Sequence, residues 1–170
     1  ASFLPKAFGI EEPGMRRPMT NEELKIKIAE LLPAAIFDEA GEFTAVNVDA
    51  ADWKNFSRQL HFDEALQFDF LSFLTCIDFK THLTMLYHFD SYTFHHNLVV
   101  KIKLDAAKPE VETVSDIWQT ANFHEREVYE LFGVHFINHP DLRLLILPDG
   151  WEGKNPLRKD FEDAVNMIKL

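Results

Sequence analysis

Among the 170 residues of the chain there is a single cysteine, Cys76. One thiol cannot form a disulfide within the chain, and an iron–sulfur cluster normally requires four thiolate ligands, so we expect the chain to hold no cluster by itself. Cys76 lies in the apolar stretch of residues 70–79. This position predicts a buried and unreactive thiol.

Long apolar runs are absent as well. No stretch approaches the roughly 18–20 apolar residues that cross a bilayer. Residues 1–19 lack the basic segment followed by an apolar segment that defines a signal peptide. We therefore expect neither a membrane span nor export, so that any attachment to a membrane runs through partner proteins.

Basic residues are few, with 17 Lys and Arg against 28 Asp and Glu, and the net charge is −11. Binding to a phosphate backbone needs clustered Lys and Arg, and adsorption to anionic lipid needs a basic surface. We therefore expect no nucleic-acid partner and no direct adsorption to lipid. Phenylalanine is abundant instead, with 16 residues, and some of these rings are candidates for contact with a partner.

Motifs of catalytic and metal sites are missing. The sequence contains no Gly-x-Ser-x-Gly, phosphate loop or dinucleotide fingerprint. His124 and Glu125 begin like a zinc-protease motif, but Val128 stands where the second histidine belongs. Glu125 and Glu127, two apart on a helix, point in different directions and do not form an acid/base pair. The histidine pairs that are close in sequence are also poor metal ligands: His95–His96 and His135–His139.

The first third of the chain predicts two helices and a hairpin. Residues 1–19 contain three prolines and form an expected irregular arm. Thr20 and Glu23 fit a capping box for a helix that ends at Pro33. Residues 35–38 and 42–48 predict a hairpin, after which Asp49 is expected to cap a second helix. The apolar face of that second helix consists of Trp53, Phe56 and Leu60.

The middle of the chain predicts a sheet. Apolar residues alternate with others over residues 71–79, 83–89 and 98–104, and residues 110–114 are a candidate short strand. In the first of these strands we expect five residues to share one face: Leu71, Phe73, Thr75, Ile77 and Phe79. The predicted fold class is α+β, a single domain with a mixed β-sheet, helices packed on it, and extended arms at both ends.

A short helix is predicted over residues 123–132, with Gly133 as its left-handed cap. Its apolar face is expected to contain His124, Val128, Leu131 and Phe132. Arg126 and Glu130, four apart, are expected to pair, while Glu125, Glu127 and Glu130 lie in solvent.

The chain after Gly133 is rich in Pro, Arg and Trp and has little apolar periodicity. Arg and Trp are favoured at interfaces, so Arg143, Trp151 and Arg158 are predicted to contact a partner. Composition alone leaves a loose, solvated C-terminus equally open. The expected division is an arm at residues 1–19, a core at 20–133 and a docking tail at 134–170.

Four blocks of residues resemble a known family. They are Glu125 to Gly133, which read EREVYELFG; His139 to Arg143; Leu147 to Gly153; and Pro156 to Phe161. In their order and spacing they resemble the C subunit, also called the 30 kDa subunit, of NADH-quinone oxidoreductase, respiratory complex I. The pair Lys154-Asn155 is one residue longer than the single His that is frequent in the family.

The resemblance implies a non-catalytic subunit of the peripheral arm of a proton-translocating NADH-quinone oxidoreductase. NADH, FMN, iron–sulfur clusters and quinone would belong to partner subunits, chiefly the D subunit at the quinone site, with the B and I subunits nearby. The expected location is the cytoplasmic side of the cell inner membrane. An equivalent subunit of a membrane-bound hydrogenase or a ferredoxin-fed complex is the alternative. The expected interface residues are Glu125, Arg126, Glu127, His139, Arg143, Trp151, Arg158, Lys159 and Asp160.

Overall fold

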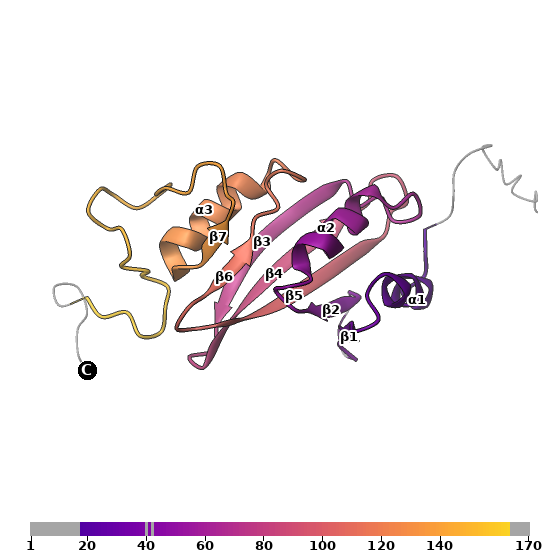
Figure 1. Cartoon of the computed structure of the whole chain (residues 1–170), viewed down its shortest axis with the longest axis horizontal. Coiled ribbons are helices and arrows are strands. Elements are labelled where there is room, and N and C mark those ends of the chain that lie inside the picture. Colours follow the sequence, from indigo (N-terminus) through magenta and orange to yellow (C-terminus); the bar gives the residue numbers. More distant parts are fainter. Residues whose placement is uncertain (1–17, 40, 42, 164–170) are drawn as a thin grey trace, which may run out of the picture.

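The computed structural model describes residues 18–39, 41 and 43–163, so most of the expected N-terminal arm lies outside the described residues. The predicted α+β fold with a single domain is confirmed (Figure 1). In chain order the elements are α1 (Asn21–Leu31), β1 (Ile36–Phe37), β2 (Ala45–Val48), α2 (Trp53–Phe62), β3 (Phe70–Asp78), β4 (His82–Asp90), β5 (Asn97–Asp105), β6 (Glu110–Glu112), α3 (Ala121–Phe132) and β7 (His135–Ile137).

The main sheet has five strands in the order β1-β2-β5-β4-β3. The pair β2–β5 is parallel and the other pairs are antiparallel, which confirms the predicted mixed sheet. A second, two-stranded sheet joins β6 and β7 in parallel. Since β3 is the last strand in the order, it forms one edge of the main sheet.

The core lies on the face of the main sheet that α2, β6 and α3 cover (Figure 1). The predicted alternation of β4 is confirmed, because Leu83, Met85, Tyr87 and Phe89 are all fully buried. The Trp53 ring of α2 lies 4.5 Å from the Tyr87 ring. Aromatic packing of this kind supplies a large share of the buried apolar surface.

Strand β3 differs from the expected pattern. The register shifts between Leu71 and Phe73, so that Ser72 is an extra residue in a β-bulge. A one-residue shift exchanges the two faces of a strand. Leu74 and Cys76 therefore point into the core. The prediction that Phe73, Thr75, Ile77 and Phe79 share a face with buried Leu71 is wrong, since these four residues are exposed.

The helix ends test several local predictions. The capping box is present, with the Glu23 amide donating to Thr20 Oγ1 at 3.3 Å. Gly133 ends α3 with a φ of 76°, as predicted. Asp49 does not cap α2, because a turn over residues 50–52 places the first helical residue at Trp53. The predicted apolar face of α2 is nevertheless buried.

The residues just after Gly133 belong to the core. Val134 and Phe136 are buried in it, and β7 pairs with β6. A strand at this place was not predicted from the sequence, which has only three residues of alternation here.

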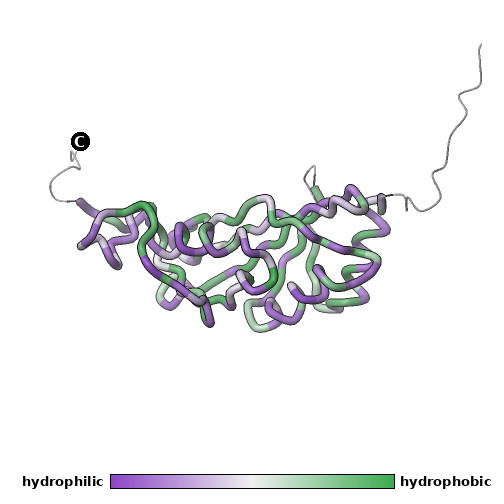
Figure 2. Tube along the Cα trace, turned by 90° about the horizontal axis from the view of Figure 1, so that it is seen from above, coloured by the Kyte–Doolittle hydropathy of each residue, from purple (hydrophilic) through white to green (hydrophobic). Residues whose placement is uncertain are grey.

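No helix in the described part of the chain has the length and apolar character needed to cross a membrane. Hydrophobic and hydrophilic residues alternate at short intervals along the trace (Figure 2).

Candidate functional site

Helix α3 carries three charged residues that are buried, which corrects the predicted solvated helix. Glu125, Arg126 and Glu130 are all at most 8% exposed. A buried charge is stable only when hydrogen bonds or opposite charges compensate it. Among the described residues no ion pair joins Arg126 to Glu130, so the expected pair is wrong. Glu130 and Arg126 instead bind the backbone of one loop, residues 143–147, and Glu125 binds the segment that follows β6.

Glu130 holds the loop of residues 143–147. Its carboxylate accepts hydrogen bonds from the amides of Leu145 at 2.8 Å, Ile146 at 2.9 Å and Leu147 at 3.2 Å. Consecutive amides that converge on one anion form a concave anion-binding site, here occupied by a side chain of the same molecule. The negative charge of Glu130 is thereby compensated without a cation.

Arg126 holds the same loop through its carbonyl groups. Its Nε donates to the carbonyl oxygen of Arg143 at 3.2 Å, and its Nη2 donates to that of Leu144 at 2.8 Å. Arg126 and Glu130 therefore bind the carbonyls and the amides of one irregular segment. This segment lacks a strand or helix partner, and these two side chains satisfy its backbone polar groups.

The rest of the described tail is fixed to the domain at three further places. The Leu157 amide donates to the Leu131 carbonyl oxygen at 3.0 Å. The Lys159 amide donates to Asp78 Oδ2 at 2.8 Å, and Arg158 Nη2 donates to the Ala106 carbonyl oxygen at 3.1 Å. The tail is thus bound to α3 and to the end of β3, and the alternative of a loose C-terminus does not hold for residues 138–163.

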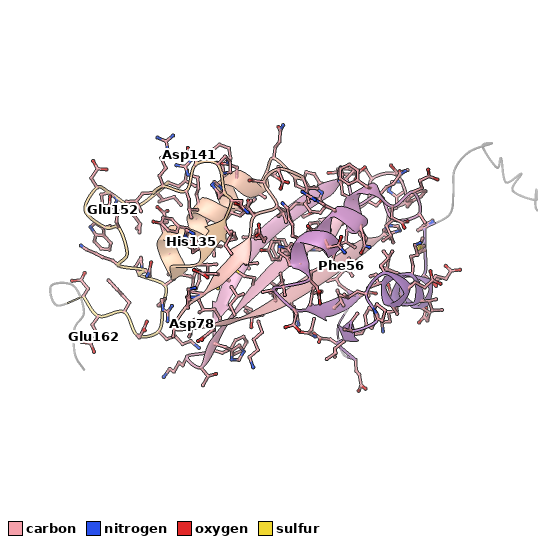
Figure 3. All side chains as sticks on the ribbon, viewed as in Figure 1. Phe56, Asp78, His135, Asp141, Glu152 and Glu162 are labelled. Carbon is pink, nitrogen blue, oxygen red and sulfur yellow. The ribbon has the colours of Figure 1, made fainter. Side chains whose placement is uncertain are left out.

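Several apolar side chains of this tail point outward while its backbone bonds inward. Ile146 is 65% exposed and Leu157 is 54% exposed. Trp151 is half-buried, with Lys154 Nζ 4.3 Å from the ring centroid. In Figure 3 the labelled Asp141 and Glu152 lie along this segment, on the side of α3 that faces away from α2.

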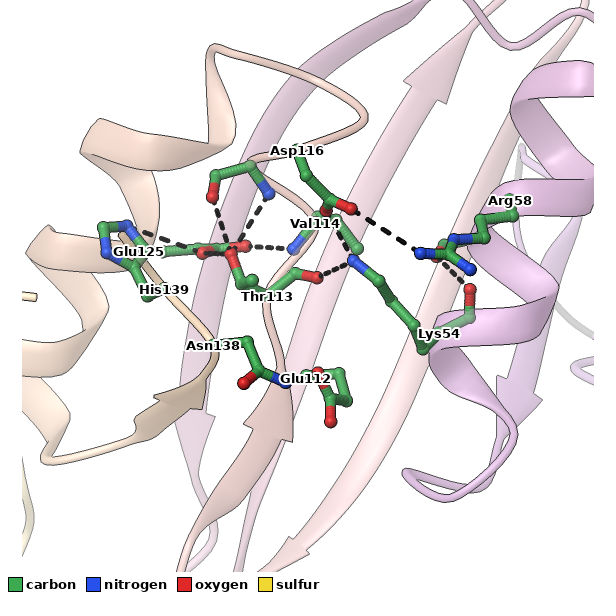
Figure 4. Close-up of polar contacts among 11 residues, drawn as sticks. Lys54, Arg58, Glu112, Thr113, Val114, Asp116, Glu125, Asn138 and His139 are labelled. Atoms are coloured by element: carbon green, nitrogen blue, oxygen red, sulfur yellow. Dashed lines mark hydrogen bonds and ion pairs between the residues drawn. The ribbon is translucent and has the colours of Figure 1, made fainter. Parts of the chain in front are cut away.

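Glu125 binds the segment that follows β6 (Figure 4). It accepts hydrogen bonds from the Thr113 hydroxyl and from the Val114 amide, the latter at 2.8 Å. His139 Nε2 lies 3.7 Å from Glu125 Oε2, and both side chains are fully buried. The Asp141 amide donates to His139 Nδ1 at 3.0 Å, so that the ring proton is on Nε2. Glu125 therefore connects β6, α3 and the start of the tail.

Burial sets the protonation of this pair. It raises the pKa of Glu125 from 4.5 to about 7, although the bonds from Thr113 and Val114 act in the opposite direction. Burial also lowers the pKa of His139. Both shifts favour the uncharged forms, which is the expected response of ionisable groups in an apolar interior.

The structure brings together some of the predicted site residues. Arg126 meets the backbone at Arg143, Glu125 meets His139, and the three residues 158–160 line a cavity of about 180 Å³ with Asp78 and Lys80. Glu127 lies half-buried on α3. The described residues contain no group of three or more His, Cys, Asp or Glu that could hold a metal ion.

Glu130 was missed as a residue that organises the tail, and the burial of Glu125 was missed as well. A signal for Glu125 was present, because it lies on the helical stripe formed by Ala121, Val128 and Phe132. A carboxylate on an apolar stripe indicates a buried acceptor. No comparable signal exists for Glu130, whose partners are amides of an irregular loop.

Comparison with known proteins agrees with these features. The family model described as respiratory-chain NADH dehydrogenase, 30 Kd subunit, matches residues 46–165. The C subunit of NADH-quinone oxidoreductase from Chloroherpeton thalassium is 36% identical over 165 residues, which are 93% of this chain and 67% of that protein. The C subunit of F(420)H(2) dehydrogenase from Methanosarcina mazei is 38% identical over 138 residues, 79% of this chain and 87% of that protein.

A longer relative and a solved structure complete the comparison. The C/D subunit of NADH-quinone oxidoreductase from Phocaeicola vulgatus is 43% identical over 104 residues, which are 60% of this chain but only 20% of that protein. A chain of the membrane-bound sulfane sulfur reductase, an archaeal respiratory membrane complex, matches with a TM-score of 0.72 and 28% identity over 83% of this chain and 85% of that chain. The predicted family is therefore confirmed, and the chain belongs to the 30 Kd subunit family of respiratory-chain NADH dehydrogenase, which is the C subunit family of NADH-quinone oxidoreductase.

Proposed function

We propose that the chain is a docking subunit, without cofactor or catalytic site of its own, in the peripheral arm of a proton-translocating NADH-quinone oxidoreductase. Its role is to support electron transfer from NADH to quinone by holding the D subunit, here called the quinone-site subunit, in place. The observation that carries this proposal is the described tail, residues 138–163, within the expected docking segment 134–170. Its backbone is fixed to the domain, while Ile146 and Leu157 remain exposed.

A fixed segment with exposed apolar side chains is suited to binding. Ordering a flexible loop on association costs about 0.5–1.5 kcal/mol for each immobilised side chain, in addition to the backbone entropy. Glu130 and Arg126 order residues 143–147 when the chain folds. Much of this entropy loss therefore occurs before association with a partner. Exposed Ile and Leu side chains on such a segment favour burial against a partner.

The predicted interface residues divide into two groups under this proposal. Arg143, Lys159 and Asp160 are exposed and are proposed to contact the partner directly, together with half-buried Trp151. Arg158 has a side chain that is only 16% exposed, and its contact with a partner is accordingly limited. Glu125, Arg126 and His139 act by holding the tail in position. Glu127, half-buried on α3, stays a predicted interface residue without a part in holding the tail.

The identity of the partner is supported by the C/D relative, in which the C and D subunits are named as one protein. Two subunits that occur in one chain are expected to be neighbours when they occur as separate chains. We accordingly propose the quinone-site subunit as the chief partner, with the B and I subunits nearby. The complex is proposed to lie on the cytoplasmic side of the inner membrane, with NADH, FMN, iron–sulfur clusters and quinone in the other subunits.

The substitution Ile146→Asp tests the docking role. Its side chain is solvent-exposed, so the fold should remain, but a carboxylate buried against an apolar partner surface is costly. We expect the quinone-site subunit to be lost from the purified peripheral arm and quinone reductase activity of the membranes to fall with it. Ile26→Asp on α1 is the matched control, because Ile26 is 63% exposed and lies far from the tail. Normal assembly and activity with Ile146→Asp would refute the docking role of the tail.

A second candidate is the equivalent subunit of a complex with another electron donor. The likeness to the F(420)H(2) dehydrogenase subunit and to the sulfane sulfur reductase favours it, since both contain a related subunit. Quinone reduction by membranes that contain the complex, measured with NADH, reduced F420 and reduced ferredoxin in turn, distinguishes the two candidates. Quinone reduction with NADH and with neither of the other donors supports the first proposal. Quinone reduction with another donor and not with NADH supports the second.

A further inference from the structure

The face of the main sheet opposite α2 and α3 carries apolar residues where polar ones are expected. We define the outer sheet face by Phe73, Ile77 and Phe79 of β3 and its following turn, and by Leu86 and His88 of β4. A half-covered antiparallel sheet normally has polar residues on its solvent side. Here Phe73 and Ile77 are each 40% exposed and Phe79 is 50% exposed. Phe73 and Phe79 are thus two of the phenylalanines that lie outside the core.

The strand register places these residues in adjoining rows. Phe73 is opposite His88, Thr75 is opposite Leu86, and Ile77 is opposite Thr84. The rows continue onto β5, where Lys101 is opposite Leu86 and Lys103 is opposite Thr84. The outer sheet face is therefore one continuous surface that is three strands wide.

Ring contacts extend this surface at both ends. Phe43 and Phe73 each lie 5.1 Å from the His88 ring, and the Phe79 ring stacks on His82 at 5.0 Å. Three of these rings are phenylalanines that are 40–50% exposed. Contiguous exposed aromatic surface on a protein of this size marks an interaction site more often than scattered apolar residues do.

The area of the outer sheet face decides between possible occupants. Three strands about 4.8 Å apart and four rows about 7 Å apart cover on the order of 400 Å². A stable interface buries about 800 Å² on each partner. Two copies of the chain that met face to face would fall short of that value. A partner that also covers the tail would reach it.

The tail reaches the end of β3, the edge strand that carries part of the outer sheet face. The Lys159 amide donates to Asp78, the last residue of β3, and Arg158, Lys159 and Lys80 line one cavity with that residue. The side chain that follows Asp78 is Phe79, at the end of the outer sheet face. A partner seated on residues 143–160 is therefore next to β3.

The charge at one end of the outer sheet face fits an acidic partner. The end near the tail has four cations, Lys80, Lys103, Arg158 and Lys159, against three anions, Asp78, Asp105 and Asp160. This local excess of one positive charge occurs in a chain with a net charge of −11. It fits a partner surface with acidic residues around an apolar centre.

We propose that the outer sheet face is a second docking surface, which the partner bound to the tail also covers, through an apolar patch with an acidic rim. This inference rests on the proposed function, which names that partner as the quinone-site subunit. It adds that β3, in addition to the tail, contacts the quinone-site subunit, and that Phe73 and Ile77 are the central side chains.

The test measures binding of the full chain to the purified quinone-site subunit of the same organism by calorimetry. The double variant Phe73→Lys/Ile77→Lys is expected to bind at least tenfold more weakly. Phe62→Lys on α2 is the matched control, since Phe62 is 71% exposed on the other side of the sheet. It is expected to bind within twofold of the unchanged chain. Binding of the double variant within twofold would overturn the inference.

The tail variant Ile146→Asp separates this inference from the proposed function. If Ile146→Asp weakens binding and the face variant does not, the tail docks on the quinone-site subunit and the outer sheet face does not. If neither weakens binding, or the quinone-site subunit does not bind the chain, both proposals fail. If the chain alone is a dimer that the face variant dissociates, with binding of the quinone-site subunit unchanged, the face belongs to a second copy and the inference is overturned.

A measurement without substitutions covers the case in which the face variant fails to fold. Hydroxyl radicals oxidise exposed phenylalanine rings, so the oxidation of Phe73, Phe79 and Phe62 can be followed in the unchanged chain. Binding of the quinone-site subunit is expected to reduce oxidation of Phe73 and Phe79 severalfold and to leave Phe62 unaffected. Equal oxidation of Phe73 and Phe79 with and without that partner would overturn the inference.

Discussion

The substitution Glu130→Ala removes the acceptor that holds the loop of residues 143–147. The Glu130 carboxylate accepts bonds of 2.8–3.2 Å from three consecutive amides, beginning at Leu145. Hydrogen bonds to a charged group contribute about 1.5–3 kcal/mol each. Because the freed amides can bond to water on this exposed loop, we take the lower part of the range. The three bonds share one carboxylate and are not additive, so we expect the loop to lose about 3 kcal/mol of stability against local opening, less than the sum of three separate bonds.

Amide hydrogen exchange followed by NMR measures this opening. A loss of about 3 kcal/mol corresponds to exchange that is roughly 100-fold faster at Leu145, Ile146 and Leu147, because each 1.4 kcal/mol is a factor of ten. Amides of β4 in the core should keep their rates. Glu127→Ala is the control, since Glu127 lies on the same helix and accepts no hydrogen bond from the loop among the described residues.

Two results would refute this account of Glu130. If the three loop amides exchange at unchanged rates, the carboxylate does not hold the loop. If exchange accelerates equally in the loop and in β4, Glu130 stabilises the whole domain and the tail is not a separate unit that α3 holds in place.

Three further predictions follow from buried groups and tight turns. Because the pKa of Glu125 is raised from 4.5 to about 7, its ionisation lowers the free energy of unfolding as the pH rises from about 4.5 to 7, by about 3 kcal/mol in total. Urea unfolding should therefore show that Glu125→Gln loses less stability over this range than the unchanged chain, and parallel pH profiles would contradict this. A Cβ on Gly133 would lie 2.6 Å from the Asn155 side chain, with φ +76°, whereas at Gly150, with φ +83°, it would meet nothing within 4 Å. Gly150→Ala should lower the free energy of unfolding by about 1–2 kcal/mol through backbone strain alone. Calorimetry should find a larger decrease in Tm for Gly133→Ala. Equal decreases in Tm would show that the contact with Asn155 is unimportant. Burial raises the pKa of Cys76 from 9.0 to about 12. At pH 8 the Cys76 thiol should therefore react with a thiol reagent on the order of 1,000-fold more slowly in the folded chain than in urea. Equal reaction rates would contradict the burial of Cys76.

Features with local causes could be predicted from the sequence. The alternation of β4 and β5, the capping box at Thr20 and the cap at Gly133 depend on residues within a few positions, and the structure has all of them. The orientation of β3 could not be predicted, because both of its faces are apolar. Leu74 and Cys76 on one face and Phe73 and Ile77 on the other give the same pattern. Only the bulge at Ser72 decides which side is buried.

The candidate site depends on contacts between distant residues. Glu125 bonds to Thr113 and Val114, eleven or more positions earlier, and Glu130 bonds to amides fifteen or more positions later. Residue type alone assigned these carboxylates to solvent, because charged residues on a short helix are usually exposed. The tail lacks periodicity because polar side chains of α3, rather than an apolar stripe, hold it in place.

The most direct test of the docking account is a structure of the assembled peripheral arm. The account predicts that the quinone-site subunit covers the side chains of Ile146 and Leu157, and that the backbone of residues 143–147 keeps its bonds to Arg126 and Glu130, with Cα shifts of about 1 Å or less. Ile146 and Leu157 exposed to solvent in the assembled arm, or a loop refolded away from Glu130, would contradict it.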